Sequence, residues 1–173
     1  MPGAILFDFN GVIADDEHLH FEAFREVLDQ EGVRLSRDVY VGDYLGLDDR
    51  EMLATALRDA GAGQRDVLEL VRRKAVVYQR MAADGVRLFP GVRELIVDLA
   101  DSFPLAVVSG ALRPEIDSIL GAASLRDRFR VVVSAEDMRR GKPDPEGYLM
   151  GWQRLRDGVP GLGDLSPADC VVI

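Results

Sequence analysis

The sequence has a single cysteine, no long apolar run and a shortage of positive charge, and each deficit excludes a class of protein. Cys170 is the only cysteine in 173 residues, so no disulfide framework exists and a reducing cytoplasm is the expected compartment. No apolar run approaches the roughly 20 residues that a membrane-spanning helix needs. Residues 1–9 also lack the basic region and cleavage site of a secretion signal. We therefore expect a soluble, cytoplasmic protein with no membrane partner.

Acidic residues outnumber basic ones, 30 to 21, which gives a formal net charge of −9. A surface that binds nucleic acid needs a basic stripe, so this balance argues against a nucleic-acid partner. A site for a phosphorylated molecule would have to be positive only locally. The chain length allows either one domain or a small core with an insertion.

The most informative stretch is residues 4–16, AILFDFNGVIADD. Residues 4–7 form a continuous apolar run, which is typical of a strand buried on both faces of a parallel sheet. Asp8 follows the run directly, and the carboxyl ends of such strands line the crevice where open α/β sheets bind ligands. Asn10 and Gly11 then predict a turn that brings main-chain groups close to Asp8. This layout is typical of a functional site.

Four helical segments are predicted next, without an intervening strand. In the first, apolar residues recur at helical spacing after the acidic run at residues 15–17, which favours a helix start, and the pattern stops at Gly32. The other three are predicted at residues 36–44, 48–60 and 64–83. Because they stand between two strand signals, the four helices indicate an insertion rather than part of the sheet.

Strand signals then return. Residues 104–110, Pro-Leu-Ala-Val-Val-Ser-Gly, predict a second buried strand, which ends in Ser109 and Gly110. A short hydroxyl beside exposed backbone N–H groups can hydrogen-bond a phosphate oxygen without adding bulk. A third strand is predicted at residues 129–133, and residues 166–173 predict a turn that leads into a fourth strand.

A lysine stands in a rigid turn between the third and fourth strands. Residues 141–145 read Gly-Lys-Pro-Asp-Pro, and the two prolines fix the backbone around Lys142. A long side chain therefore leaves a rigid platform, as a site that must aim an ammonium group requires.

In this order, the motifs resemble those of the haloacid dehalogenase-like hydrolase superfamily. Residues 8–12, Asp-Phe-Asn-Gly-Val, match its first motif, Asp-x-Asp-Gly-Val/Thr, at every position except Asn10. Ser109 stands at the position of the second motif and Lys142 at that of the third. The helical insertion is similar to the cap that one large branch of the superfamily carries.

This resemblance implies an α/β fold with a doubly wound, Rossmann-like parallel sheet and an inserted helical-bundle cap. The core is expected at residues 1–14 and 87–173, and the cap at residues 15–86. In relatives, an acidic motif follows the fourth strand, whereas this chain stops at Ile173. We therefore expect a core that is truncated at its C-terminus and leaves an exposed edge strand, so that the protein is a monomer or a homodimer paired through that edge.

The resemblance also implies an activity, the Mg²⁺-dependent hydrolysis of small phosphorylated metabolites. Asp8 would attack phosphorus and form an aspartyl-phosphate, and the ion would be held by Asp8 and the main-chain carbonyl of Asn10. Lys142 would neutralise the charge, while Ser109 and Gly110 would contact the phosphoryl group.

Three residues of the expected cap are similar to substrate-binding positions in capped relatives. They are His20 near the cap entrance, Arg50 and Lys74. An alternative interpretation makes His20 a surface or helix-capping side chain, and Arg50 and Lys74 solvated charges on helix faces.

Asn10 leaves the function open, because relatives have a general acid and base at its position. An amide cannot exchange that proton, which should lower the rate roughly 10²- to 10⁴-fold. Asn10 is thus an engineered trap, a native feature of a slow enzyme, or a sign of binding without turnover. A β-phosphoglucomutase-like sugar-phosphate mutase and a non-catalytic phosphate-binding protein are the alternatives to an attenuated phosphatase. A receiver-like signalling domain fits less well, because helices directly follow the first strand.

Overall fold

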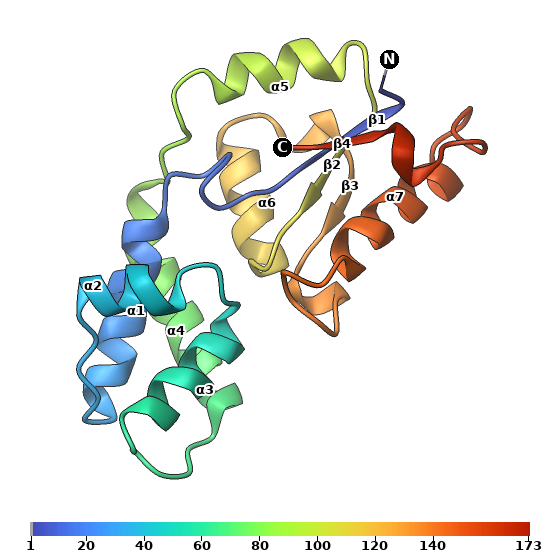
Figure 1. Cartoon of the computed structure of the whole chain (residues 1–173). Helices are drawn as coiled ribbons and strands as arrows, with labels where there is room; N and C mark the ends of the chain where they lie inside the picture. The colour runs from blue at the N-terminus through green and yellow to red at the C-terminus, as the bar shows by residue number, and fades with distance from the viewer. Residues whose placement is uncertain (1) are drawn as a thin grey trace. The chain divides into compact units, whose positions relative to one another are not determined.

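The computed structural model in Figure 1 describes residues 2–173, which fall into two compact units. Unit 1 comprises residues 2–15 and 85–173, and unit 2 comprises Asp16–Asp84. The sequence-based boundaries of core and cap differ from these limits by one or two residues.

Unit 1 contains a four-stranded parallel sheet with the strand order β3-β2-β1-β4. Its strands are β1 (Ala4–Phe7), β2 (Leu105–Val108), β3 (Phe129–Val133) and β4 (Cys170–Val172). Leu6 on the central strand is in register with Ala106 and Val172. The predicted α/β fold with a parallel sheet is confirmed.

The sheet is covered by helices on both faces, which explains why β1 is apolar at every position. Alternate side chains of a strand point to opposite faces. Ile5 and Phe7 pack in a cluster with α5 (Val92–Ala100) and α6 (Arg113–Ala122), whereas Leu6 packs in a separate cluster with α7 (Glu146–Gly158). Figure 1 shows α6 and α7 on opposite sides of the strands. Three single-turn 3₁₀ helices complete the unit: η3 (Arg126–Arg128), η4 (Ala135–Asp137) and η5 (Pro167–Asp169).

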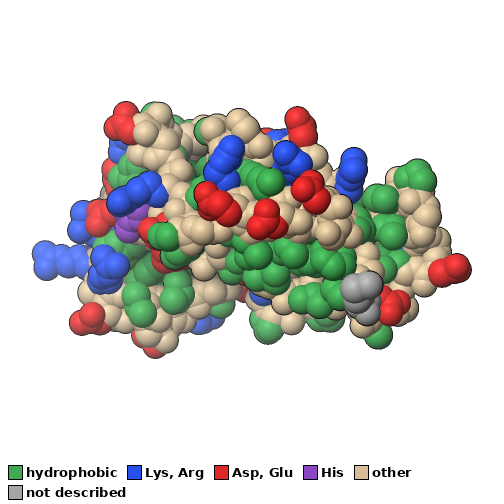
Figure 2. Space-filling view, turned by 90° about the horizontal axis from the view of Figure 1, so that it is seen from above, with side chains coloured by type: hydrophobic (Ala, Val, Ile, Leu, Met, Phe, Trp, Pro, Cys, Tyr) green, Lys and Arg blue, Asp and Glu red, His purple; other side chains and the backbone are tan. Residues whose placement is uncertain are grey.

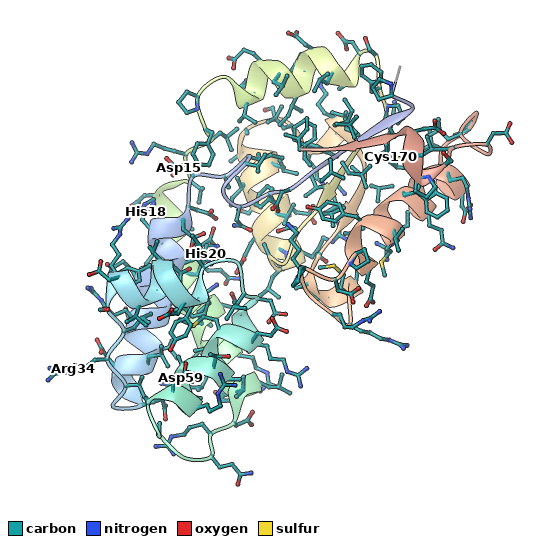
Figure 3. The ribbon with its side chains drawn as sticks, in the orientation of Figure 1. Asp15, His18, His20, Arg34, Asp59 and Cys170 are labelled. Carbon is teal, nitrogen blue, oxygen red and sulfur yellow. The ribbon has the colours of Figure 1, made fainter. Side chains whose placement is uncertain are left out.

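β4 lies at the edge of the sheet beside β1, and its side chains are largely accessible. Val171 and Val172 are 44% and 52% exposed. Cys170, labelled in Figure 3, is partly buried, and its thiol lies 3.7 Å from the Ser166 carbonyl oxygen. Burial raises the pKa of this thiol, which disfavours the reactive thiolate and agrees with a structural role.

Unit 2 is a helical bundle with its own apolar core. It contains α1 (Glu17–Gln30), α2 (Arg37–Val39), the π-helical turn η1 (Tyr40–Tyr44), α3 (Asp49–Asp59), α4 (Val67–Met81) and the 3₁₀ turn η2 (Ala82–Asp84). The four predicted helical segments are confirmed, although the second consists of three α-helical and five π-helical residues, and the fourth begins three residues later than expected.

Capping explains where most helices of unit 2 begin. The side chains of Ser36, Asp48 and Asp66 each accept a backbone N–H three residues ahead. Asp16 occupies the N-cap position of α1, yet its side chain makes no capping hydrogen bond. It instead accepts a hydrogen bond from the Tyr78 hydroxyl.

Two further observations concern the surface. Among residues 2–173, no helix is both long and apolar enough to cross a bilayer. Acidic and basic side chains lie next to one another over the face drawn in Figure 2.

The packing of α7 on the sheet leads to a stability prediction. An added Cβ at Gly151 would lie 3.0 Å from Val108 and 3.1 Å from Leu6, so we expect Gly151→Ala to lower the free energy of unfolding by about 1–3 kcal/mol through overpacking. Gly121→Ala, in α6, is the matched control, because a Cβ there meets nothing within 4 Å. It should leave stability unchanged or raise it by up to about 1 kcal/mol. Urea unfolding of both variants tests this, and equal midpoints would contradict it.

Candidate active site

The carboxyl end of the sheet brings Asp8 and Lys142 into direct contact. Asp8 follows β1, and its Oδ1 accepts the Phe9 N–H at 2.7 Å and lies 2.5 Å from Lys142 Nζ. The side chains of Asp8 and Lys142 are 29% and 31% exposed, so the pair remains open to solvent. The arrangement offers a carboxylate and a cation at the end of a buried strand, where a phosphoryl group can approach both.

Ser109 and Asn10 form a second contact at the same edge of the sheet. The Ser109 hydroxyl follows β2, donates to Asn10 Oδ1 at 3.2 Å and accepts the Ala111 N–H at 3.0 Å. Ser109 is buried, whereas Gly110 beside it is exposed. These bonds fix the hydroxyl, and the exposed glycine leaves its backbone accessible.

A tight turn after Asp8 holds Asn10 in place. The Gly11 N–H donates to the Ala14 carbonyl at 3.0 Å, and the N–H groups of Ile13 and Ala14 both donate to the Phe9 carbonyl. Gly11 has a φ of +77°, a conformation that glycine adopts without steric cost. The Asn-Gly pair therefore forms the turn that its sequence indicates.

The residues at Asp8 fit a hydrated divalent cation. The Phe9 N–H and Lys142 Nζ both contact Asp8 Oδ1, and the side chain is accessible. Mg²⁺ usually keeps several waters and needs only one or two carboxylates from the protein. No group of three His, Cys, Asp or Glu residues that could form a complete metal cage occurs in the described part of the chain. A partly solvated site is therefore the kind that these residues can provide.

In unit 2, Lys74 is fully buried and lies between two partners. Its Nζ is 2.7 Å from His20 Nδ1 and 2.8 Å from Asp49 Oδ2, and it lies 4.7 Å from the ring centre of Phe24. The interpretation of Lys74 as a solvated helix charge is therefore wrong. A buried ammonium is stable only when it is paired and hydrogen-bonded in this way.

The contact with Lys74 also determines the tautomer of His20. An ammonium group can only donate, so His20 Nδ1 must accept, and the neutral ring then carries its proton on Nε2. Nε2 lies 3.4 Å from Asp16 Oδ2, and the ring stacks on Tyr78 at 4.4 Å between centres. Figure 3 shows His20 and His18 on α1; His20 is buried and His18 exposed, so the surface alternative for His20 is wrong as well.

Arg50 is the one sequence-predicted residue of unit 2 outside this network. It lies in the first turn of α3, directly after Asp49, and is exposed. Its placement agrees with a solvated helix charge, and a role in binding remains a prediction.

Asp16, Asp49 and Tyr78 belong to the buried network, although their sequence context did not identify them. Tyr78 donates its hydroxyl to Asp16 at 2.5 Å. The sequence offered one signal: of 21 basic residues, only Lys74 and Lys142 are lysines. In the structure, each of these lysines lies against a carboxylate.

The loop that follows β3 is anchored by Asp137. Its carboxylate accepts hydrogen bonds from Arg113 on α6, Arg154 on α7 and both the backbone and the hydroxyl of Ser134. Burial raises the pKa of this carboxyl, but the hydrogen bonds from Arg154 and Ser134 outweigh it and hold the pKa well below its ordinary value. The anchor joins two helices to the segment that leads to Lys142.

Because the pKa of Asp137 is lowered in the folded protein, we expect its ion pairs to stabilise the fold above the ordinary aspartate pKa of about 3.9. The contribution should disappear as the pH falls through the lowered value. Urea unfolding of the parent and of Asp137→Asn between about pH 3 and pH 7 measures it. The parent should be more stable near neutrality, and the difference should shrink below about pH 4. A difference that does not depend on pH would contradict the assignment.

The pairing of Lys74 leads to a second stability prediction. Asp49→Asn leaves a buried ammonium without its carboxylate and should destabilise the protein by about 1–3 kcal/mol, below the value for a fully buried pair because Asp49 is 23% exposed. Glu69→Gln is the matched control on α4, where Glu69 pairs with Arg72 in solvent. Thermal unfolding of both variants should show a loss only for Asp49→Asn, and equal losses would refute the special role of this pair.

Comparisons with known proteins agree with this geometry. The family model described as haloacid dehalogenase-like hydrolase matches residues 5–158. Fructose-1-phosphate phosphatase YqaB of Escherichia coli is 30% identical over 97% of this chain and 84% of its own length. The β-phosphoglucomutase of Bacillus subtilis is 29% identical over 98% of this chain and 74% of its own length.

A solved structure is also similar. It is an aspartate-to-asparagine mutant of CbbY from Rhodobacter sphaeroides in complex with xylulose-1,5-bisphosphate. The TM-score is 0.81 at 27% identity, with coverage of 99% of this chain and 77% of that one. The matched family model, the sequence relatives and the fold lead to one assignment. The chain belongs to the haloacid dehalogenase-like hydrolase family.

Proposed function

We propose that this protein is a Mg²⁺-dependent phosphatase of small phosphorylated sugars that acts through an aspartyl-phosphate on Asp8 and is attenuated by Asn10. The observation that carries the proposal is the contact between Asp8 and Lys142 at the carboxyl end of β1. Family membership supports the reaction class, and similarity to a fructose-1-phosphate phosphatase supports the substrate class.

In the proposed reaction, Asp8 Oδ2 attacks phosphorus, the bond to the sugar oxygen breaks, and Asp8 carries the phosphoryl group until water releases it. Lys142 offsets the negative charge of the carboxylate and of the phosphoryl oxygens. Ser109 and the backbone at Gly110 contact the phosphoryl group. Mg²⁺ bound by Asp8 and the main-chain carbonyl of Asn10 would supply further positive charge for the transferring group.

Asn10 limits this reaction because its amide cannot pass a proton to the leaving oxygen or take one from water. The loss of a general acid and base is worth roughly 10²- to 10⁴-fold in rate. Capture of a phosphorylated sugar does not require that proton transfer. The asparagine mutant of CbbY was solved with a sugar bisphosphate, which supports binding by this protein in its present form.

Unit 2 is proposed to act as a cap that selects the substrate, with His20, Arg50 and Lys74 as its binding residues. Lys74 and His20 are held by Asp49 and Asp16, so any contact with substrate would be made from a rigid network.

A sugar-phosphate mutase is the second candidate, favoured by the similarity to β-phosphoglucomutase. A mutase needs proton transfer in both half-reactions, so Asn10 counts against it more heavily than against a phosphatase.

The proposal predicts that Asn10→Asp raises the rate of phosphate release by about 10²- to 10⁴-fold. Phosphate release from fructose 1-phosphate and a panel of other hexose and pentose phosphates, with Mg²⁺ and with a chelator, measures the change. The panel also includes β-glucose 1-phosphate, whose conversion to glucose 6-phosphate without phosphate release would indicate a mutase.

Asp8→Asn in the Asn10→Asp background is the control, because it removes the nucleophile and should abolish the gained activity. A variant that stays as slow as the parent on every substrate would reject the phosphatase proposal. Sugar-phosphate binding without any product would then favour the non-catalytic alternative.

A further inference from the structure

The segment around Lys142 is held in place by the carboxylate of Glu146, a residue outside the motifs described above. Lys142 lies in the sequence RRGKPDPE, residues 139–146, between η4 and the first turn of α7. The Glu146 side chain turns back across this segment: its Oε1 accepts the Arg139 N–H at 3.0 Å, and its Oε2 lies 3.3 Å from Arg140 Nε. Glu146 thus ties the residues before Lys142 to the helix that follows it.

A second set of bonds closes the segment from within. The Asp144 N–H donates to the Gly141 carbonyl at 3.0 Å, and Asp144 Oδ1 accepts the Glu146 N–H at 2.9 Å. Asp144 Oδ2 lies 2.9 Å from a guanidinium nitrogen of Arg140, so Arg140 contacts both carboxylates. The backbone on both sides of Lys142 is therefore fixed by two carboxylates and one arginine.

A residue of α7 also contacts the Lys142 side chain directly. Tyr148, two residues after Glu146, places its ring centre 5.5 Å from Lys142 Nζ, within the range of a cation–π contact. Gly147, between them, lets α7 lie close to β2, since a Cβ there would be 3.0 Å from Val108. The helix start thereby becomes a platform for the lysine.

These contacts contribute little to global stability. Arg140 is 70% exposed, and ion pairs in solvent are screened. Their geometric effect is different, because they hold the turn from which Lys142 reaches Asp8 Oδ1 at 2.5 Å.

We propose that Glu146 is a positioning residue that aims the Lys142 ammonium at Asp8 by bonding the Arg139 N–H and Arg140 from the first turn of α7. The proposal rests on the proposed function only for its catalytic consequence, since the contact between Lys142 and Asp8 can be measured without any turnover.

The composition of the chain makes that measurement direct. The protein has only two lysines, so lysine labelled with ¹³C at Cε gives two side-chain signals, which Lys74→Arg and Lys142→Arg assign. In the parent, Asp8→Asn should shift the Lys142 signal and leave the Lys74 signal in place. In the Glu146→Ala background, Asp8→Asn should no longer shift the Lys142 signal, because the two groups are already apart.

Asp157→Ala is the matched control. Asp157 pairs with Arg156 at 2.7 Å near the other end of the same helix. In this background the Lys142 signal should respond to Asp8→Asn as in the parent. Glu146→Gln keeps an oxygen for the Arg139 N–H and loses the charge beside Arg140, so we expect a partial response. A full response in the Glu146→Ala background would overturn the proposal.

Thermal unfolding separates positioning from loss of structure. Glu146→Ala should keep its Tm within about 3 °C of the parent, as for other solvent-screened pairs. A larger fall together with a lost Lys142 response would show a merely structural role and would also overturn the proposal.

The catalytic consequence is tested in the Asn10→Asp background. There Glu146→Ala should lower kcat by about 10- to 100-fold and leave KM nearly unchanged, because a misplaced cation fails mainly in the transition state. An inactive Asn10→Asp protein whose Lys142 signal still depends on Glu146 would reject the proposed function and keep the positioning role. An active Asn10→Asp protein whose kcat is unchanged by Glu146→Ala would keep the proposed function and reject the positioning role of Glu146.

Discussion

The contact between Asp8 and Lys142 is the interaction on which the rest of unit 1 converges. It joins the end of the central strand β1 to a turn that lies 134 positions further along the chain. Neither residue is well buried, so the pair is held by what each is attached to rather than by its own strength. β1 is fixed because all four of its residues are buried, and neighbouring strands bond it on both sides. The cation is placed by α7 and the segment that precedes it.

The packing of α7 on the sheet therefore determines where Lys142 lies relative to β1. Gly147 and Gly151 let the helix approach β2 and β1 so closely that an added Cβ would lie 3.0–3.1 Å from Val108 and Leu6. Asp137 fixes the chain between β3 and the helix through Arg113 and Arg154. A change in the core beneath the helix would thus move the turn that carries Lys142. The packing of α7 on the sheet thus contributes both to the stability of the fold and to the geometry of the site.

Local sequence features predicted the strands and the helical segments of unit 2, and they singled out Asp8, Ser109 and Lys142, because each of these residues follows a buried strand or stands in a proline-fixed turn. The network around Lys74 was less accessible. Its bonds join residues 54 and 62 positions apart, and only the packing of α1 against α4 brings them together. The side chain of Asp16 shows the same limit: the acidic run at residues 15–17 indicates only that a helix starts there, whereas the Asp16 carboxylate accepts a hydrogen bond from a distant tyrosine. Side-chain pairs that form only when helices pack together leave no regular spacing in the sequence by which they could be predicted.

The use of lysine rather than arginine at position 142 follows from what the aspartate must do. Arginine presents a planar fork that tends to bind both oxygens of a carboxylate, whereas lysine offers a compact charge on a flexible stem. The shortest contact of Lys142 is with Oδ1, the oxygen that also accepts the Phe9 N–H. An attacking carboxylate needs one oxygen unengaged while its charge is offset through the other. In a chain with 21 basic residues, the choice of one of its two lysines here matches that requirement. A lysine in this position can screen Asp8 without covering it.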